Sequence, residues 1–121
     1  MPRIAICAPS TPILPEDAAR VEALAGDYPG ISLQFHPQCF VVDGHFAGSD
    51  EVRLAALIEC ANDPVFDAVW FARGGYGAGR IAEAAIRRVS QTAQNKLFLG
   101  YSDAGYLLGG LYRARIGHPS Q

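Results

Sequence analysis

The chain alternates short, almost purely apolar segments with longer amphipathic ones, and this alternation constrains its fold more than any other feature. Residues 3–8, 67–72 and 97–99 are apolar runs, and in residues 31–35 apolar side chains alternate with polar ones. Such runs, separated by helical segments, are typical of βα units that build a parallel sheet. We therefore expect an α/β domain with a mostly parallel sheet, in which residues 31–35 lie nearer an edge.

Three segments between these strands and one segment after the last strand carry apolar residues at helical spacing. The first begins at Pro15 and ends near Gly26, and the second is capped by Ser49 and stops at 62–64. The third and fourth cover residues 81–89 and 104–111. No strand is predicted after the fourth helix, so the sequence predicts a small sheet of about four strands and a truncated domain.

Composition excludes several classes of function. Half of the 121 residues are hydrophobic, 18% are charged and the net charge is -2, so we expect a folded domain and no nucleic-acid partner. The first apolar run is too short for a signal peptide, because Pro9 interrupts it. No stretch approaches the roughly 20 apolar residues of a membrane span, and we expect a cytoplasmic protein.

A serine lies where the fourth apolar run meets the last helical segment. In Gly100-Tyr101-Ser102-Asp103-Ala104, small residues stand two positions before and two positions after Ser102. A strand, a sharp turn with a serine and a helix form a nucleophile elbow, and small flanking residues let the strand and the helix approach. Free N–H groups at the helix start can also hold an oxyanion. The same pattern fits a plain helix N-cap, so the turn alone leaves both interpretations open.

A glycine loop, Arg73-Gly74-Gly75-Tyr76-Gly77-Ala78-Gly79, follows the third apolar run. Its glycines indicate positive φ angles or a bound group close to the backbone. In a parallel sheet this loop and the Ser102 turn both follow carboxyl ends of strands, where ligands bind. An N–H of Gly74 or Gly75 is therefore a candidate to complete an oxyanion hole with that of Asp103. Arg73 is a candidate partner for a substrate carboxylate or for a salt bridge within the protein.

The glycine loop also supports a competing interpretation. Residues 77–82 fit the dinucleotide fingerprint G-x-G-x-x-A between a strand and a helix. The match follows the third strand, and Asp103, the only acidic candidate for the ribose, lies rather far along the chain. A Walker P-loop motif is absent from the sequence. A nucleotide-binding module stays an alternative.

Few residues are candidates for binding a metal or for acting as the base of a serine nucleophile. His36 and Cys39 form at most half of a metal site, so no metal is expected. Without a CxxC pair, we expect the cysteines to be buried as small hydrophobic residues; they are Cys7, Cys39 and Cys60. A serine nucleophile needs a base. We expect the three histidines at the surface, and none offers that base; they are His36, His45 and His118.

Four motifs in one order span nearly the whole chain: residues 6–10 (ICAPS), 46–53 (FAGSDEVR), 63–77 (DPVFDAVWFARGGYG) and 100–103 (GYSD). Together they resemble the LD-carboxypeptidase family of serine peptidases, which includes LD-carboxypeptidase A and the microcin C self-immunity hydrolase. The resemblance implies a flavodoxin-like three-layer domain, of which residues 1–121 form the amino-terminal nucleophile domain without the family's carboxy-terminal domain.

The resemblance also implies the site. Ser102 matches the family's nucleophile, and the N–H groups of Asp103 and of Gly74 or Gly75 match its oxyanion hole, with Arg73 and Tyr76 as candidate substrate-binding residues. The family's triad is Ser-Glu-His, and its glutamate and histidine come from the carboxy-terminal domain. Members are cytosolic, metal-independent, without a cofactor and commonly dimeric. They release D-alanine from the L-centre of diaminopimelate in murein tetrapeptides during cell-wall recycling.

The resemblance leaves three alternatives open. A microcin-immunity-type amidase that acts on a peptidyl-nucleotide analogue belongs to the same family. A nucleotide-binding module would use the Gly77 loop for phosphates. The third alternative is a non-catalytic remnant of a hydrolase. In every hydrolase interpretation, we expect this chain alone to be inactive.

Overall fold

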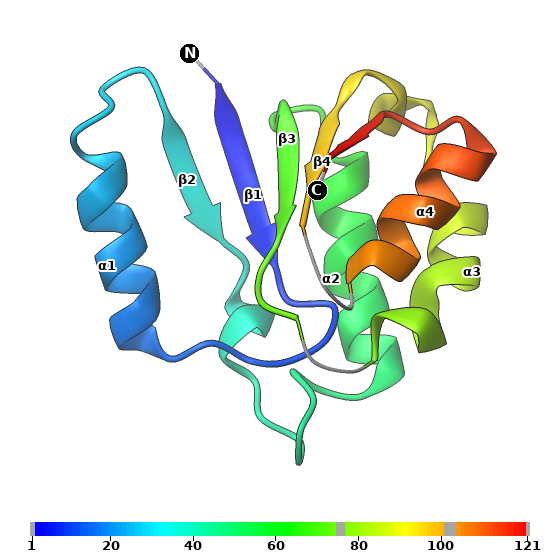
Figure 1. The fold of residues 1–121 in the computed structure, drawn as a ribbon, viewed down its shortest axis with the longest axis horizontal. Helices are drawn as coiled ribbons and strands as arrows, with labels where there is room; N and C mark the ends of the chain where they lie inside the picture. The colour runs from blue at the N-terminus through cyan, green and yellow to red at the C-terminus, as the bar shows by residue number, and fades with distance from the viewer. Residues whose placement is uncertain (1, 75–76, 101–103, 121) are drawn as a thin grey trace.

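The computed structural model describes residues 2–74, 77–100 and 104–120, and Figure 1 shows their arrangement. Strands and helices alternate along the chain. In order they are β1 (Arg3–Cys7), α1 (Pro15–Ala25), β2 (Ser32–Phe35), a 3-10 helix (Pro37–Phe40), α2 (Asp50–Asn62), β3 (Ala68–Phe71), α3 (Ala78–Arg88), a second 3-10 helix (Gln91–Asn95), β4 (Leu97–Leu99), α4 (Gly105–Ala114) and β5 (His118–Ser120).

The strands of this described part form one sheet in the order β2-β1-β3-β4-β5, and every neighbouring pair is parallel. From β1 the chain moves one way to reach β2, and then the other way to β3, β4 and β5. Because parallel crossovers are right-handed, this reversal places α1 on one face and α2, α3 and α4 on the other (Figure 1). The expected three-layer α/β domain with a parallel sheet is confirmed.

The helix boundaries follow the local signals. Pro15 occupies the first turn of α1, and Gly26 ends that helix. Ser49 caps α2, because its hydroxyl accepts a hydrogen bond from the N–H of Val52 at 3.2 Å. At the other end of α2, the buried Lys96 ammonium donates to the carbonyls of Cys60 and Asp63. Burial lowers the pKa of Lys96, and the helix's carboxyl-terminal carbonyls supply its partners.

The prediction of no strand after the last helix is wrong. Residues His118–Ser120 form β5, parallel to β4, and the N–H of His118 donates to the carbonyl of Lys96 at 2.8 Å. This strand lacks an apolar run and contains Pro119, whose missing N–H is tolerated at the edge of a sheet. These residues form a strand because they pair with β4, and their sequence has no apolar pattern that would predict one.

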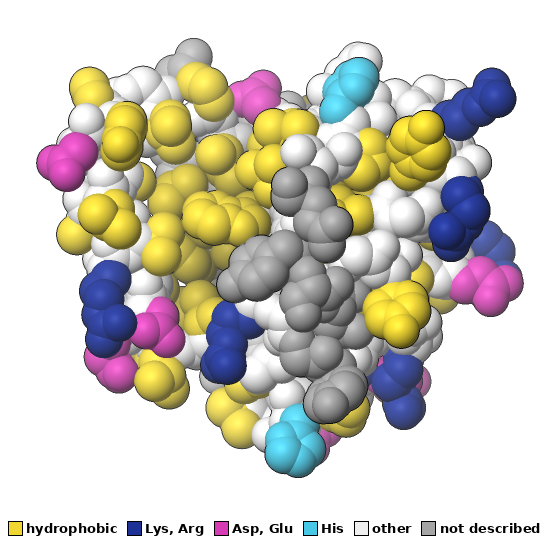
Figure 2. Space-filling view, viewed as in Figure 1, with side chains coloured by type: hydrophobic (Ala, Val, Ile, Leu, Met, Phe, Trp, Pro, Cys, Tyr) yellow, Lys and Arg dark blue, Asp and Glu magenta, His cyan; other side chains and the backbone are white. Residues whose placement is uncertain are grey.

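The two faces of the sheet differ in cover. On the face of α2, α3 and α4, the side chains of Val69, Phe71 and Phe98 are at most 1% exposed. On the face of α1, Phe35 and Trp70 stay half-buried and line a hollow of about 360 Å³ beside Ile6, visible as the yellow region to the left of centre in Figure 2. The main core therefore lies on the face with three helices.

The cysteines are buried, as predicted for Cys7, Cys39 and Cys60. The Cys39 thiol donates to the carbonyl of Ile6 at 3.2 Å, and burial raises its pKa to about 12. Contact with Cys60 and burial also raise the pKa of Cys7. Among the described helices, none has the length and apolar character to cross a membrane.

Candidate active site

The neighbouring strands β1, β3 and β4 are parallel, so their carboxyl ends meet at one edge of the sheet (Figure 1). Arg73 and Gly74 lie directly after β3 on this edge. Ser102, Asp103, Gly75 and Tyr76 lie outside the described residues. Their assigned roles therefore stay predictions, and the site is built here from the residues that flank them.

The residues on both sides of the Ser102 turn pack as a nucleophile elbow requires. Gly100 is buried after β4, and Ala104 is fully buried directly before α4. A Cβ atom added at Gly100 would lie 3.0 Å from the Cβ of Ala104 and 3.2 Å from that of Phe71. The neighbours would have to move by a few tenths of an ångström to admit a methyl group, so the residues on either side of the turn are closely packed.

The glycine loop begins with a strained residue. Arg73 has a φ of 51°, in the left-handed region that residues with a Cβ seldom occupy. The N–H of Ala72 donates to the carbonyl of Cys7 at 2.8 Å, so the pairing of β3 with β1 continues to the start of the loop. The chain therefore leaves the sheet abruptly at Arg73.

Arg73 bonds a backbone carbonyl in place of the internal salt bridge considered for it. Its guanidinium donates to the carbonyl of Pro12 at 3.2 Å, and it forms no ion pair among the described residues. The residue is exposed. The contact with Pro12 ties the glycine loop to the loop between β1 and α1, and Arg73 remains a candidate substrate-binding residue.

A buried arginine from α2 joins the turns of this edge, and sequence reasoning assigned it no role. Arg53 is 1% exposed. Its Nη1 donates to the carbonyls of Pro9 at 2.7 Å and of Gly77 at 2.9 Å, and its Nε donates to that of Gly48 at 3.1 Å. One helical turn separates Arg53 from the buried Leu57, so its place on the buried stripe of α2 was the available signal.

Asp50 and Phe46 complete the surroundings of this arginine. The Asp50 carboxylate pairs with Arg53 on one side and with Arg80 at 2.9 Å on the other. The hydrogen bond from Arg80, together with the charges of both arginines, lowers the pKa of Asp50. The Arg53 guanidinium also lies 4.9 Å from the centre of the Phe46 ring, a cation–π distance.

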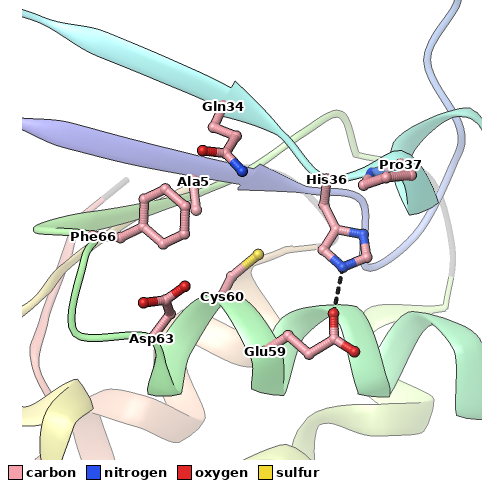
Figure 3. Close-up of a pocket in the computed structure, with 8 residues that line it drawn as sticks. All are labelled: Ala5, Gln34, His36, Pro37, Glu59, Cys60, Asp63 and Phe66. Carbon is pink, nitrogen blue, oxygen red and sulfur yellow. Dashed lines mark hydrogen bonds and ion pairs between the residues drawn. The ribbon is translucent and has the colours of Figure 1, made fainter.

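His36 lies in a separate pocket of about 460 Å³ between β1, β2 and α2 (Figure 3). Its Nδ1 accepts a hydrogen bond from the N–H of Gln38 at 3.0 Å, so Nε2 carries the proton that bonds Glu59 at 2.6 Å. These bonds occupy both ring nitrogens, and His36 is therefore not free to act as a base. His45 and His118 are exposed, as predicted, whereas His36 is half-buried.

The described residues contain no group of three or more histidine, cysteine or acidic side chains that could hold a metal. The proposed half-site is also engaged elsewhere, since His36 bonds Glu59 and the Cys39 thiol bonds a backbone carbonyl.

The nucleotide fingerprint loses support from the surroundings of its first glycine. A Cβ atom at Gly77 would lie 2.7 Å from Nη1 of Arg53 and 3.0 Å from the Phe46 ring. The Cα of Gly77 is thus covered by the protein's own side chains, and its carbonyl is bonded to Arg53. Arg53 and Phe46 therefore account for the glycine at position 77 without a bound nucleotide.

A three-layer α/β domain whose parallel strands run in the order β2-β1-β3-β4-β5 belongs to the flavodoxin-like class of domains. The family model described as the LD-carboxypeptidase N-terminal domain matches residues 4–118. The chain therefore belongs to the LD-carboxypeptidase family of peptidases.

Individual relatives agree with this assignment. A carboxypeptidase-named protein of Streptomyces coelicolor is 38% identical over 106 residues, which are 84% of this chain and 33% of that protein. The murein tetrapeptide carboxypeptidase of Pseudomonas aeruginosa is 35% identical over 69 residues, 57% of this chain and 22% of that protein. The chain spans about a third of the length of the Streptomyces relative.

Solved structures share the fold. The muramoyltetrapeptide carboxypeptidase of Oxalobacter formigenes superposes with a TM-score of 0.65 at 29% identity, over 83% of this chain and 33% of that one. The microcin C7 self-immunity protein MccF superposes with a TM-score of 0.76 at 18% identity, over 94% of this chain and 34% of that one. The second likeness shows the fold alone.

Proposed function

We propose that the protein containing this chain is a serine-type LD-carboxypeptidase that releases D-alanine from murein tetrapeptides in peptidoglycan recycling. The packing of Gly100 against Ala104 and Phe71 carries the proposal, because it brings β4 and α4 as close as a nucleophile elbow needs. Membership of a peptidase family and relatives named as murein carboxypeptidases support the same activity.

In this proposal the reaction is acyl transfer through Ser102. Its hydroxyl oxygen attacks the carbonyl carbon of the peptide bond, and a histidine takes the hydroxyl proton. The N–H groups of Asp103 and of Gly74 or Gly75 hold the oxyanion. The C–N bond then breaks, the histidine protonates the leaving amine of D-alanine, and water hydrolyses the acyl-enzyme.

Residues 1–121 supply the nucleophile and the oxyanion hole in this proposal, as the amino-terminal domain of a longer protein. The histidine and glutamate of the triad come from the part of the protein outside this chain, as the family resemblance implies. Without them we expect the isolated chain to be inactive. We further propose a cytoplasmic homodimer that needs no cofactor.

The replacement Ser102→Ala in the full-length protein tests this assignment. We expect kcat for D-alanine release from a murein tetrapeptide to fall by about 10⁴-fold or more, since removing the nucleophile leaves only binding and the oxyanion hole. Release of D-alanine is followed by an amino-acid assay, with thermal unfolding as the control for folding. Near-normal release by the variant would contradict the role of Ser102.

The same protein preparation separates the alternatives. Cleavage of an aminoacyl-sulfamoyl nucleoside without cleavage of the tetrapeptide would identify an amidase of the microcin-immunity type. Saturable binding of NAD or ATP, with neither hydrolysis, would identify a nucleotide-binding module. Absence of all three activities would indicate a non-catalytic remnant.

A further inference from the structure

Arg53 is a buried cation at the edge of the sheet that carries the proposed active site, and the proposed reaction gives it no task. Only 1% of its surface is exposed. Burying a guanidinium is costly unless its N–H groups are satisfied, so its partners indicate its purpose. Its described partners include the Asp50 carboxylate and three backbone carbonyls, two of which come from segments distant in the sequence.

These partners are carbonyls of three different loops. Pro9 belongs to the loop after β1, Gly48 precedes α2, and Gly77 ends the glycine loop before α3. Pro9 is 44 positions and Gly77 is 24 positions away from Arg53 in the sequence. The planar guanidinium thus fixes the end of the glycine loop relative to the loop after β1.

The fit at Gly77 leaves little freedom for the loop. Gly77 has a φ of 116°, and a Cβ atom there would lie 2.7 Å from Nη1 of Arg53. The Phe46 ring centre lies 4.9 Å from the guanidinium, and the same added Cβ atom would lie 3.0 Å from that ring. At the end of the loop, the Gly77 carbonyl thus bonds Arg53 while its Cα lies against the same side chain.

We propose that Arg53 is a positioning residue for the site: through Pro9 and Gly77 it sets the place of the glycine loop and so of the oxyanion-hole N–H that Gly74 or Gly75 supplies. This inference rests on the proposed function. Arg53 touches no reacting atom in this role. It acts because oxyanion stabilisation depends on donors held in place before the reaction.

Arg80 provides a matched control within the same cluster. It pairs with Asp50 at 2.9 Å and lies 5.9 Å from the centre of the Phe46 ring, as a second cation beside the same two residues. Its side chain is 63% exposed, and its described hydrogen bonds go to Asp50. The Arg80 side chain thus shares the charge environment of Arg53, and its described hydrogen bonds reach no loop carbonyl.

The test compares Arg53→Gln, Arg53→Lys and Arg80→Gln in the full-length protein, using D-alanine release from a murein tetrapeptide. We expect kcat of Arg53→Gln to fall by about 10²-fold with KM little changed, the size of effect that a small misplacement of catalytic groups produces. Arg53→Lys restores part of kcat, since an ammonium keeps the charge but does not span the carbonyls. Arg80→Gln stays within about threefold of wild type.

Amide hydrogen exchange supplies a readout that does not depend on activity. We expect residues 72–80 to exchange about tenfold faster in Arg53→Gln than in wild type, while Arg80→Gln leaves the exchange of residues 72–79 unchanged. A general loss of stability would instead speed exchange throughout the core strands. If the wild-type protein releases no D-alanine, the proposed function fails, and the exchange comparison still decides whether Arg53 holds the loop.

Two results would overturn the inference. One is a folded Arg53→Gln protein with wild-type kcat and unchanged amide hydrogen exchange at residues 72–80. The other is an equal fall in kcat in Arg53→Gln and Arg80→Gln. If Arg53→Gln does not fold, Asp50→Asn carries the test, because it removes the carboxylate that pairs with Arg53 and keeps its carbonyl partners. We then expect kcat to fall more for Asp50→Asn than for Arg80→Gln, and an equal or smaller fall would overturn the inference.

Discussion

The two sides of the candidate active site are held by different physical means. On the side of the glycine loop, which we call the polar half, the buried Arg53 bonds the carbonyls of Pro9, Gly48 and Gly77. On the side of the Ser102 turn, which we call the packed half, Gly100 lies against Ala104 and Phe71 with room for no further atom. Directional, charge-assisted hydrogen bonds fix the first half, and close packing fixes the second.

This difference predicts which changes destabilise each half. Charge-assisted hydrogen bonds respond to changes in charge and donor geometry, and Asp50, with its lowered pKa, adds a dependence on acid. Close packing responds to volume and is insensitive to pH. Replacements that change only volume, only backbone freedom or only charge should therefore separate the halves.

We expect the largest loss of stability where volume and backbone strain act together, in the polar half. In Gly77→Ala a methyl group would meet the Arg53 guanidinium and the Phe46 ring at a φ of 116°. We expect the free energy of unfolding to fall by about 3 kcal/mol, from overpacking and from the left-handed backbone. Urea denaturation followed by circular dichroism measures this loss.

Gly44→Ala is the control for backbone strain alone. Gly44 has a φ of 62°, but a Cβ atom there has no neighbour within 4 Å. We expect a loss of about 1 kcal/mol. Equal losses at Gly44 and Gly77 would mean that the contact with Arg53 adds nothing to the requirement for glycine.

The packed half should show an intermediate effect that comes from volume alone. In Gly100→Ala the new Cβ atom would lie 3.0 Å from that of Ala104 and 3.2 Å from that of Phe71, so β4 and α4 must separate slightly. We expect the free energy of unfolding to fall by about 1–2 kcal/mol. Gly30→Ala, with nothing within 4 Å of the added atom, should change it by less than about 0.5 kcal/mol. A neutral Gly100→Ala would contradict the tight approach.

The smallest expected effect is a dependence on acid that belongs to the polar half only. Folding lowers the pKa of Asp50, so its contribution to stability is complete above the ordinary pKa of about 4 and is lost as pH falls through the folded value. We expect Asp50→Asn to cost about 1 kcal/mol at pH 7, a small value because the carboxylate is 40% exposed.

The difference between wild type and Asp50→Asn should shrink below pH 4, whereas the deficit of Gly100→Ala stays constant. Urea denaturation of the three proteins at pH 7, 5 and 3 measures both differences. A deficit of Asp50→Asn that persists unchanged at pH 3 would assign the effect to packing instead of charge.

Most of the fold was predictable, because helices and buried strands carry their own signals. Pro15 and Ser49 mark helix starts that the structure confirms, and the strand Leu97–Leu99 has the predicted bounds. The edge strand His118–Ser120 was missed, since its hydrogen bonds with β4 define it and its side chains form no pattern. The site was predictable as motifs on one edge of the sheet, and its nucleophile stays a prediction.

The sequence by itself determined the order of strands and helices as far as α4, the small residues around Ser102 and the resemblance to a peptidase family. Only the tertiary structure decided which role a motif residue plays, and Arg53 is the clearest case. Its position on the buried stripe of α2 is local information, but its partners are backbone carbonyls of loops far along the chain. Backbone carbonyls are the same for every residue type, so no sequence pattern marks them as the partners of a buried charge.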